Sequence, residues 1–300
     1  MKTKSLKKVF NYKLVIHLIF ILMCTSFVIP LLYVISLSVT PEDIITSQGY
    51  KLIPESLDFT AYKWIFSNPH QLISSYKVTI LFSLATTVLS MIIMTMVAYA
   101  LSREQFAARQ YVTFFIYFTM LFSGGLIPSY MINTKYLHLT NNFWVYVLPS
   151  LASAYYILIL RTFFKGIPSS LVEAAKLDGA SETRTFTSIV LPLSKPVLAT
   201  VALLMLLAKW NDWQTSLLYI MDKDLYSLQY LLQKILRETE FLQQISENTN
   251  LVLNSSIMET SPIESMRFAM AILAAGPMMI IFPFFQKYFT RGLTLGAVKG

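Results

Sequence analysis

The sequence predicts an all-α membrane protein with six transmembrane helices and both termini in the cytoplasm. Among its 300 residues 55% are hydrophobic and only 13% are charged, which is not the composition of a soluble protein. Apolar runs long enough to cross a bilayer as helices recur along the chain. Of the 24 lysines and arginines, 15 fall in segments assigned to the inside, eight in outer segments and one, Lys209, within a run. Positive charge is retained on the cytoplasmic side, so this count predicts the orientation in a cell membrane.

The first predicted span, residues 14–37, follows a basic cytoplasmic segment over residues 1–13. The run is too long for a signal peptide and no small-residue cleavage site follows it, so we expect it to be retained. Pro30 is expected to kink this span. The next segment, residues 38–73, is polar and rich in turn residues, and it is predicted to lie outside.

The second to fourth spans are predicted at residues 78–101, 111–132 and 143–160. Gly124, Gly125 and Pro128 interrupt the third run, so we expect a broken helix that needs protein or water around it. Trp144 and Tyr146 are expected to anchor the fourth span at the membrane interface.

The fifth span is predicted at residues 197–220 and the sixth, bent by Pro277 and Pro283, at residues 268–289. Between them lies an outer segment, residues 221–267, whose leucine pattern predicts a helix at its start. The transmembrane domain as a whole covers residues 14–300 and ends in a short inner tail.

The stretch between spans four and five, residues 170–192, is predicted to form a helix-turn-helix on the cytoplasmic side. Ser170 and Glu173 fit a capping box, which predicts a helix start. Gly179 can adopt the left-handed conformation that ends such a helix and reverses the chain. A second helix is expected from about Ser181.

The second helix is expected to carry Phe186, Ile189 and Val190 along one face. Pro192 and Pro196 are expected to redirect the chain into the membrane.

This stretch resembles the EAA loop of the membrane subunits of ATP-binding-cassette importers. The matching positions are Glu173, Ala174, Ala175, Asp178, Gly179, Ala180, Phe186, Ile189, Leu191 and Pro192. In that family the loop is a coupling helix that docks in a cleft of a separate ATPase. The resemblance implies ATPase-coupling roles for Glu173, Ala174, Ala175, Leu177, Asp178, Gly179 and Ala180. The alternative is an ordinary amphipathic surface helix.

Two further stretches are similar to carbohydrate-importer permeases: residues 122–130, with Gly124, Gly125 and Pro128, and residues 161–168. The tail resembles that of the maltose permease subunit without a large periplasmic domain. More closely, the chain resembles the oligosaccharide permeases grouped with the lipoprotein-associated permease family, which implies a type I importer permease fold and a sugar or oligosaccharide cargo.

That resemblance implies a heteromer of this chain, a sister permease, two ATPase subunits and an extracytoplasmic solute-binding protein. ATP and Mg²⁺ would be bound by the ATPase, with no cofactor in this chain. The resemblance also implies that the tail, at Lys299 and Gly300, reaches the ATPase, and that residues 246–262 are candidates for contact with the binding protein.

Polar residues within the predicted fifth span allow two interpretations. Trp210, Asn211, Asp212 and Trp213 are candidates for lining the sugar path, because sugars combine hydroxyl groups with apolar faces that stack on aromatic rings. Lys209 and Asp212 are also spaced to form a self-neutralising pair at a subunit interface. The sequence leaves both open.

Other function classes find little support. The sequence has no HExxH zinc motif, no G-x-S-x-G elbow, no phosphate-binding loop and a single cysteine, Cys24, so we expect no catalytic residue and no metal site. The net charge of +8 lies in short clusters beside the spans, which does not indicate nucleic-acid binding. An importer of a non-sugar solute such as an amino acid or peptide, and an autonomous secondary transporter, remain as alternatives.

Overall fold

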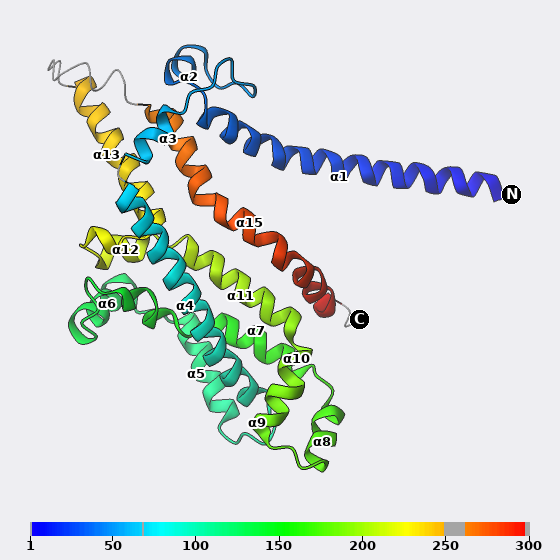
Figure 1. Cartoon of the computed structure of the whole chain (residues 1–300). Helices are drawn as coiled ribbons and strands as arrows, with labels where there is room; N and C mark the ends of the chain where they lie inside the picture. The colour runs from blue at the N-terminus through cyan, green and yellow to red at the C-terminus, as the bar shows by residue number, and fades with distance from the viewer. Residues whose placement is uncertain (1, 68, 249–261, 298–300) are drawn as a thin grey trace. The chain divides into compact units, whose positions relative to one another are not determined.

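The computed structural model describes residues 2–67, 69–248 and 262–297, and these residues form helices joined by turns, with no strand among them (Figure 1). The α-helices are α1 (Lys2–Ser38), α2 (Glu42–Gln48), α3 (Thr60–Ile65), α4 (Pro69–Ser102), α5 (Arg109–Leu121), α6 (Leu126–Met131), α7 (Ala154–Lys165), α8 (Ser169–Leu177), α9 (Glu182–Thr185), α10 (Leu191–Leu193), α11 (Lys195–Trp210), α12 (Gln214–Tyr219), α13 (Leu228–Asn248) and α15 (Ile263–Ala297). Shorter turns of 3-10 or π type are η1 (Ile132–Tyr136), η2 (Phe143–Tyr146), η3 (Leu148–Ser150), η4 (Phe186–Val190) and η5 (Lys223–Leu225). The all-α prediction is confirmed.

Within the described residues, three helices are long and apolar enough to cross a membrane alone. They are Tyr12–Ser38, Pro69–Ser102 and Ile263–Gln286. Three bent pairs reach that length and composition together: Arg109–Leu121 with Leu126–Tyr136, Phe143–Ser150 with Ala154–Lys165, and Glu182–Leu193 with Lys195–Trp210. If each pair is one span the number is up to six, so the sixfold topology stays a prediction.

The broken third span is confirmed. Helix α5 ends at Leu121 and α6 begins at Leu126, with a bend of 111° between the two helical segments. Gly125 at the break has a φ of 86°, which a residue with a side chain rarely adopts. Gly125 therefore permits the break that the sequence indicated.

The fourth span differs from the expected single helix. Residues 143–150 form two short 3-10 turns, and the α-helix begins only at Ala154 after a bend of 46°. Pro149 cannot donate a backbone hydrogen bond, and the Asn142 side chain caps the first turn by accepting from the Trp144 amide at 3.0 Å. The prediction of Tyr146 as an interfacial anchor is wrong, because Tyr146 is 0% exposed and stacks on Phe82 at 4.3 Å.

The predicted fifth span is also interrupted. Helix α11 ends at Trp210, and a separate helix, α12, begins at Gln214. The Asp212 carboxylate accepts hydrogen bonds from the Thr215 amide at 3.0 Å and the Thr215 hydroxyl at 2.8 Å. The Asp212 side chain thus holds the first turn of α12 from the position before its N-cap residue, Trp213, which favours a new helix start over continuation of the old one.

Helix α4 supplies hydroxyl groups to the irregular backbone of these broken spans. Thr86 donates to the Tyr146 carbonyl at 3.4 Å, and Ser90 donates to the Ser150 carbonyl at 3.1 Å. Thr79 accepts from the Leu228 amide, at the start of α13, at 2.8 Å. Backbone groups freed from helices inside a membrane need such partners, so α4 makes the breaks tolerable.

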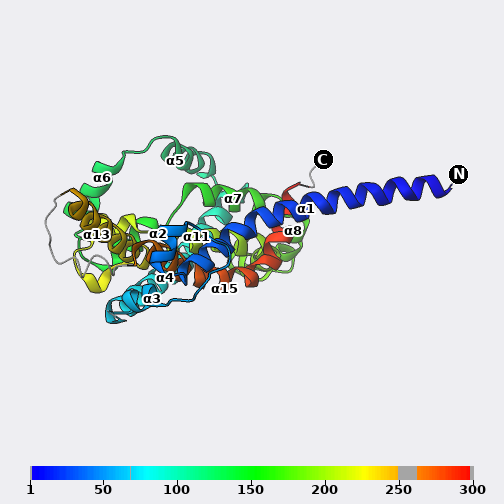
Figure 2. The same ribbon diagram turned by 90° about the horizontal axis from the view of Figure 1, so that it is seen from above.

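The first and last long helices each contain proline, with Pro30 inside α1 and Pro277 and Pro283 inside α15. Figure 2 shows α1 as one continuous helix. Helix α15 continues to Ala297, beyond residue 289 where the sixth span was expected to end. The expected inner tail is therefore helical as far as it is described.

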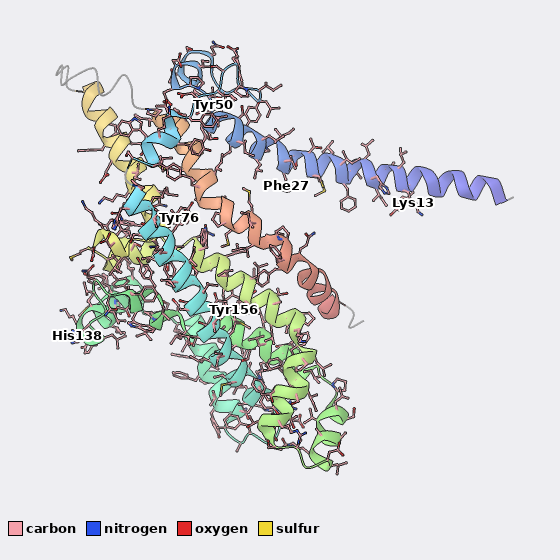
Figure 3. All side chains as sticks on the ribbon, in the orientation of Figure 1. Lys13, Phe27, Tyr50, Tyr76, His138 and Tyr156 are labelled. Atoms are coloured by element: carbon pink, nitrogen blue, oxygen red, sulfur yellow. The ribbon has the colours of Figure 1, made fainter. Side chains whose placement is uncertain are left out.

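The chain divides into two compact units, one of Met1–Pro69 and Lys234–Gly276 and the other of His70–Gln233 and Pro277–Gly300. In the first unit, the Glu42 carboxylate accepts from the amides of Glu264 and Ser265 at 2.8 and 2.9 Å and from the Ser265 hydroxyl at 3.0 Å. Tyr50, labelled in Figure 3, packs edge-on against Phe268 at 5.6 Å. A side chain distant in sequence thus caps the start of α15.

We expect Glu42→Ala to lower the free energy of unfolding by about 1 to 2 kcal/mol, because it leaves the first amides of α15 without their acceptor. Thermal unfolding of the purified chain in mild detergent would measure this change. Asp43→Ala is the matched control, since it removes the same charge from the neighbouring exposed position of α2. Equal shifts in the two variants would contradict a capping role for Glu42.

Candidate functional site

Helices α8 and α9 form the hairpin that the sequence predicted, and Gly179 makes its turn. Gly179 has a φ of 78°. The Ala180 amide donates to the Ala175 carbonyl at 2.9 Å and the Gly179 amide to the Lys176 carbonyl at 3.0 Å. These two bonds define a Schellman motif, so the left-handed role predicted for Gly179 is confirmed.

The capping box predicted at Ser170 and Glu173 is wrong. Helix α8 begins one residue earlier, at Ser169, directly after Pro168, and no side chain caps it. Proline disfavours the helical conformation in the residue before it, and Pro168 itself has an extended ψ of 127°, so the helix begins directly after Pro168. The predicted start of the second helix is confirmed, since the Ser181 hydroxyl accepts from the Arg184 amide at 3.3 Å.

The residues with predicted coupling roles lie on both faces of the hairpin. Ala175 is buried beside Val172, whereas Glu173, Ala174, Asp178 and Gly179 are exposed and Ala180 is half-buried. Leu177 is 89% exposed at the end of α8. One face of α8 is thus held by this chain and the other is open to a partner.

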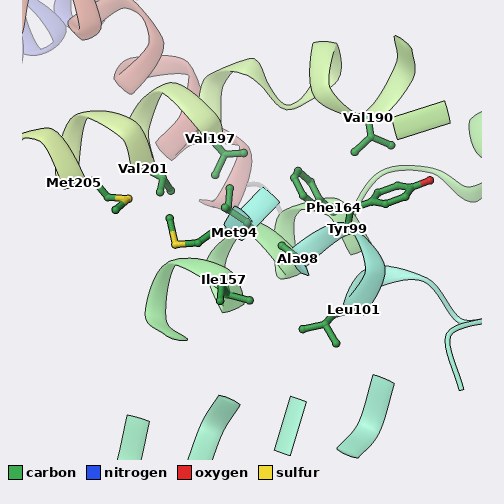
Figure 4. Packing of buried hydrophobic residues seen from close by; sticks show 11 residues of the cluster. Met94, Ala98, Tyr99, Leu101, Ile157, Phe164, Val190, Val197, Val201 and Met205 are labelled. Atoms are coloured by element: carbon green, nitrogen blue, oxygen red, sulfur yellow. The ribbon is translucent and has the colours of Figure 1, made fainter. Parts of the chain in front are cut away.

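The second half of the hairpin enters a hydrophobic core. Val190 is completely buried in it. Figure 4 shows the members of this cluster, which come from α4, α7, η4 and α11: Met94, Ala98, Tyr99, Leu101, Ile157, Leu160, Phe164, Val190, Val197, Val201 and Met205. Phe186 packs on its edge, with its ring centroid 4.8 Å from that of Tyr99. The hairpin is therefore anchored among helices that belong to three candidate spans.

The exit from the hairpin follows the predicted redirection at two prolines. Helix α10, which contains Pro192, ends at Leu193, and α11 starts at Lys195 with Pro196 in its first turn. The helical segments Glu182–Leu193 and Lys195–Trp210 are bent by 78° relative to each other.

Sequence reasoning missed a polar contact between the hairpin and α4. The Glu182 carboxylate lies 2.6 Å from Lys176 Nζ and accepts a hydrogen bond from the Tyr99 hydroxyl at 2.7 Å. The bond to Lys176, followed by that from Tyr99, lowers the pKa of Glu182. A lowered pKa in the folded state means that this stabilisation is present at neutral pH and is lost as the pH falls through the lowered pKa. No local pattern reveals this contact, although Lys176 and Glu182 flank the predicted turn.

The polar residues at the break after α11 are brought together as predicted for a charge pair. Lys209 Nζ lies 3.2 Å from Asp212, and both side chains are largely buried. Trp210 is only 2% exposed, Trp213 is half-buried, and Asn211 is exposed and accepts from Gln229 at 3.4 Å. The carboxylate of Asp212 is thus occupied by Lys209 and Thr215, and Asn211 is the most accessible of the four.

Other predicted site residues lie outside the described part of the chain. These are Lys299, Gly300 and most of residues 246–262. Among the residues that the structure does describe, no three His, Cys, Asp or Glu side chains gather so as to hold a metal ion.

Comparison with known proteins places this geometry in a family. Residues 103–295 match the family model described as binding-protein-dependent transport system inner membrane component. The chain is 36% identical to the polygalacturonan/rhamnogalacturonan transport system permease protein YtcP of Bacillus subtilis, over 94% of this chain and 95% of that protein. It is 33% identical to Protein LplC of Bacillus subtilis, over 91% of this chain and 90% of that protein.

A solved structure is similar over nearly the whole chain. It is a bacterial ABC transporter involved in the import of the acidic polysaccharide alginate, with a TM-score of 0.76 and 27% identity, covering 96% of this chain and 99% of that one. The chain belongs to the family of binding-protein-dependent transport system inner membrane components, and it is a transport subunit rather than an enzyme.

Proposed function

We propose that this chain is the permease subunit of an ATP-driven importer that moves an oligosaccharide into the cytoplasm by alternating access. The observation that carries the proposal is the α8–α9 hairpin, which has an open face toward a partner and a second half packed among α4, α7 and α11. A displacement of the open face is thereby passed to several candidate spans.

The relatives support an oligosaccharide cargo. Their names specify polygalacturonan or rhamnogalacturonan, arabinooligosaccharides and galactooligosaccharides, and the similar solved structure belongs to an alginate importer. These are all sugar polymers or their fragments, so amino acid or peptide import is not favoured. Uronate-containing oligosaccharides are the first class to test. The name of YtcP specifies galacturonans, which are built from a uronic acid, and the similar solved structure is involved in the import of the acidic polysaccharide alginate.

The partners follow from that function. We propose that a sister permease completes the path, that an ATPase pair binds ATP and Mg²⁺ in the cytoplasm, and that a solute-binding protein delivers the sugar outside. Glu173, Ala174, Leu177 and Asp178 would contact the ATPase, with Ala175, Gly179 and Ala180 shaping the hairpin, and Lys299 and Gly300 would add a second ATPase contact. Both termini and the hairpin would then lie in the cytoplasm.

The energy required is within reach of such an assembly. Moving a two-state equilibrium from 1:99 to 99:1 takes about 5.5 kcal/mol of differential binding. Closure of the ATPase pair on ATP would supply this free energy. The α8–α9 hairpin and its counterpart in the sister permease would then shift the two permeases to the outward-open state.

We also propose that the break after α11 borders the sugar path, with Asn211 and Trp213 facing it and Trp210 and Asp212 supporting them. Asp212→Ala should lower uptake, because Asp212 holds the start of α12 and neutralises Lys209. Uptake and co-purification with the sister permease would be measured together. Loss of assembly along with uptake would assign Asp212 to the interface instead. The Asn211→Ala variant tests the proposed sugar path with no change of charge.

The decisive experiment is affinity purification of the tagged chain in mild detergent from its native host, followed by reconstitution. Recovery of a second permease and an ATPase in stable proportion, and ATP-dependent uptake of tritiated oligogalacturonides, would support the proposal. A parallel assay with arabino- and galacto-oligosaccharides separates acidic from neutral cargo. Recovery of the chain alone from well-expressing membranes would count against the importer.

A further inference from the structure

A cluster of four side chains links the hairpin to the inner end of α4. Glu182 begins α9, Lys176 lies in the last turn of α8, and Tyr99 lies in the last turn of α4 with Arg103 just beyond it. One oxygen of the Glu182 carboxylate faces Lys176 Nζ at 2.6 Å, and the other accepts from the Tyr99 hydroxyl at 2.7 Å. A single carboxylate therefore joins three helix ends.

The tyrosine side of this link is fixed by packing. The Tyr99 ring lies 4.8 Å from the ring of Phe186, and the Arg103 guanidinium carbon lies 4.3 Å above its centroid. Tyr99 is only 9% exposed. Its hydroxyl therefore cannot turn away from Glu182 unless the ring leaves the core, and hydrogen bonds to a charged acceptor are stronger than neutral ones.

The lysine side of the link restrains the turn itself. Lys176 and Glu182 stand on opposite arms of the hairpin, with Gly179 between them. A Cβ built at Gly179 would meet nothing within 4 Å, so no neighbouring atom packs against the turn residue itself. The ion pair closes the hairpin across this open turn.

We propose that Glu182 is a positioning residue that makes α8, α9 and the inner end of α4 move as one body. A displacement imposed on α8 then reaches α4 directly, and α4 also carries the hydroxyls that hold the broken spans. This inference rests on the proposed importer function, but its physical content, a rigid link between α8 and α4, has its own measurement.

That measurement is the distance distribution between two spin labels in the purified complex. The labels would be placed by Ser170→Cys on α8 and Ala107→Cys in the loop after α4, both exposed positions, in a Cys24→Ser background. We expect Glu182→Ala and Tyr99→Phe each to broaden the distribution about twofold. Tyr99→Phe keeps the ring and its stacking, so it isolates the hydroxyl. Glu104→Ala, which removes an exposed carboxylate from the neighbouring loop, should leave the distribution unchanged.

The functional readout is sugar taken up per ATP hydrolysed in proteoliposomes. We expect this ratio to fall about threefold to tenfold in Glu182→Ala and Tyr99→Phe, a range set by one charge-assisted bond that is partly exposed. The double variant should be no worse than Glu182→Ala alone, because Glu182→Ala already removes the bond that Tyr99→Phe removes. Exchange of the charges by Lys176→Glu with Glu182→Lys rebuilds the ion pair but leaves no carboxylate to accept from the Tyr99 hydroxyl, so the ratio should stay as low as in Tyr99→Phe.

An unchanged spin-label distribution in both variants would overturn the inference, as would strictly additive effects in the double variant. Failure of the wild-type complex to import any tested sugar would overturn the proposed function instead. The spin-label result would still decide the rigid link in that case.

Discussion

Gly179→Val is expected to abolish sugar uptake while the ATPase continues to hydrolyse ATP. The residue has a φ of 78° and is the left-handed position of the Schellman motif that ends α8. A β-branched side chain strongly resists positive φ, so the chain must give up the two capping bonds and α8 must change direction relative to α9. We expect uptake per ATP hydrolysed to fall at least about tenfold, measured with the reconstituted complex.

Two controls separate the turn from general damage. Asparagine enters the left-handed region more readily than other residues with a side chain, so Gly179→Asn should retain most of the coupling. Gly49, which follows α2, has a similar φ of 77°, equally open surroundings and a ψ of −167°, a combination open essentially to glycine alone, so Gly49→Val imposes strain outside the hairpin. If Gly49→Val uncouples ATP hydrolysis from uptake as strongly as Gly179→Val, the turn of the hairpin has no special role.

Local rules predicted the parts of this chain that depend on local conformation. The turn at Gly179 and the break at Gly125 both need positive φ, which glycine provides, and both were found. The start of α9 at Ser181 is set by a side chain that reaches its own helix. The capping box at Ser170 failed because Pro168, two residues earlier, sets the helix start.

Hydropathy predicted where apolar segments lie but not how they are broken. Hydropathy averaged over a stretch of sequence has the same value whether its apolar residues face lipid or the interior of the protein. The average therefore assigns Tyr146, which is completely buried, to the membrane interface. It also places Asp212 inside a continuous helix, although Asp212 lies between α11 and α12 and holds the start of α12. Breaks of this kind depend on acceptors and donors elsewhere in the chain, such as Thr86 and Ser90 on α4.

The contact between Glu182 and Tyr99 could not be predicted from the sequence for the same reason. Glu182 and Tyr99 are 83 residues apart, and nothing near either residue indicates the other. In the folded chain Phe186 and Val190 pack against residues of α4, which brings Glu182 and Tyr99 together. Sequence therefore predicted the hairpin, whereas its attachment to the spans required the tertiary structure.

Tyr146→Ala is expected to lower the free energy of unfolding by about 3 to 5 kcal/mol, the usual loss for a buried aromatic side chain. The Tyr146 ring stacks on Phe82 in a second core cluster, and its hydroxyl bonds to Ser216 at 2.6 Å and to the Leu225 carbonyl at 2.8 Å. It thus joins the broken fourth span to α4, α12 and the segment before α13. Chemical or thermal unfolding of the chain in detergent would measure the loss.

Tyr146→Phe divides this effect between packing and hydrogen bonding. It keeps the ring on Phe82 but leaves the Leu225 carbonyl without its donor, which costs about 1 to 3 kcal/mol when the group is buried. Tyr155→Phe removes a hydroxyl from a side chain that is 54% exposed and should change stability by less than about 0.5 kcal/mol. If Tyr146→Phe changes the free energy of unfolding as little as Tyr155→Phe does, the polar contacts do not hold the break. Stacking on Phe82 alone would then fix the irregular segment against α4.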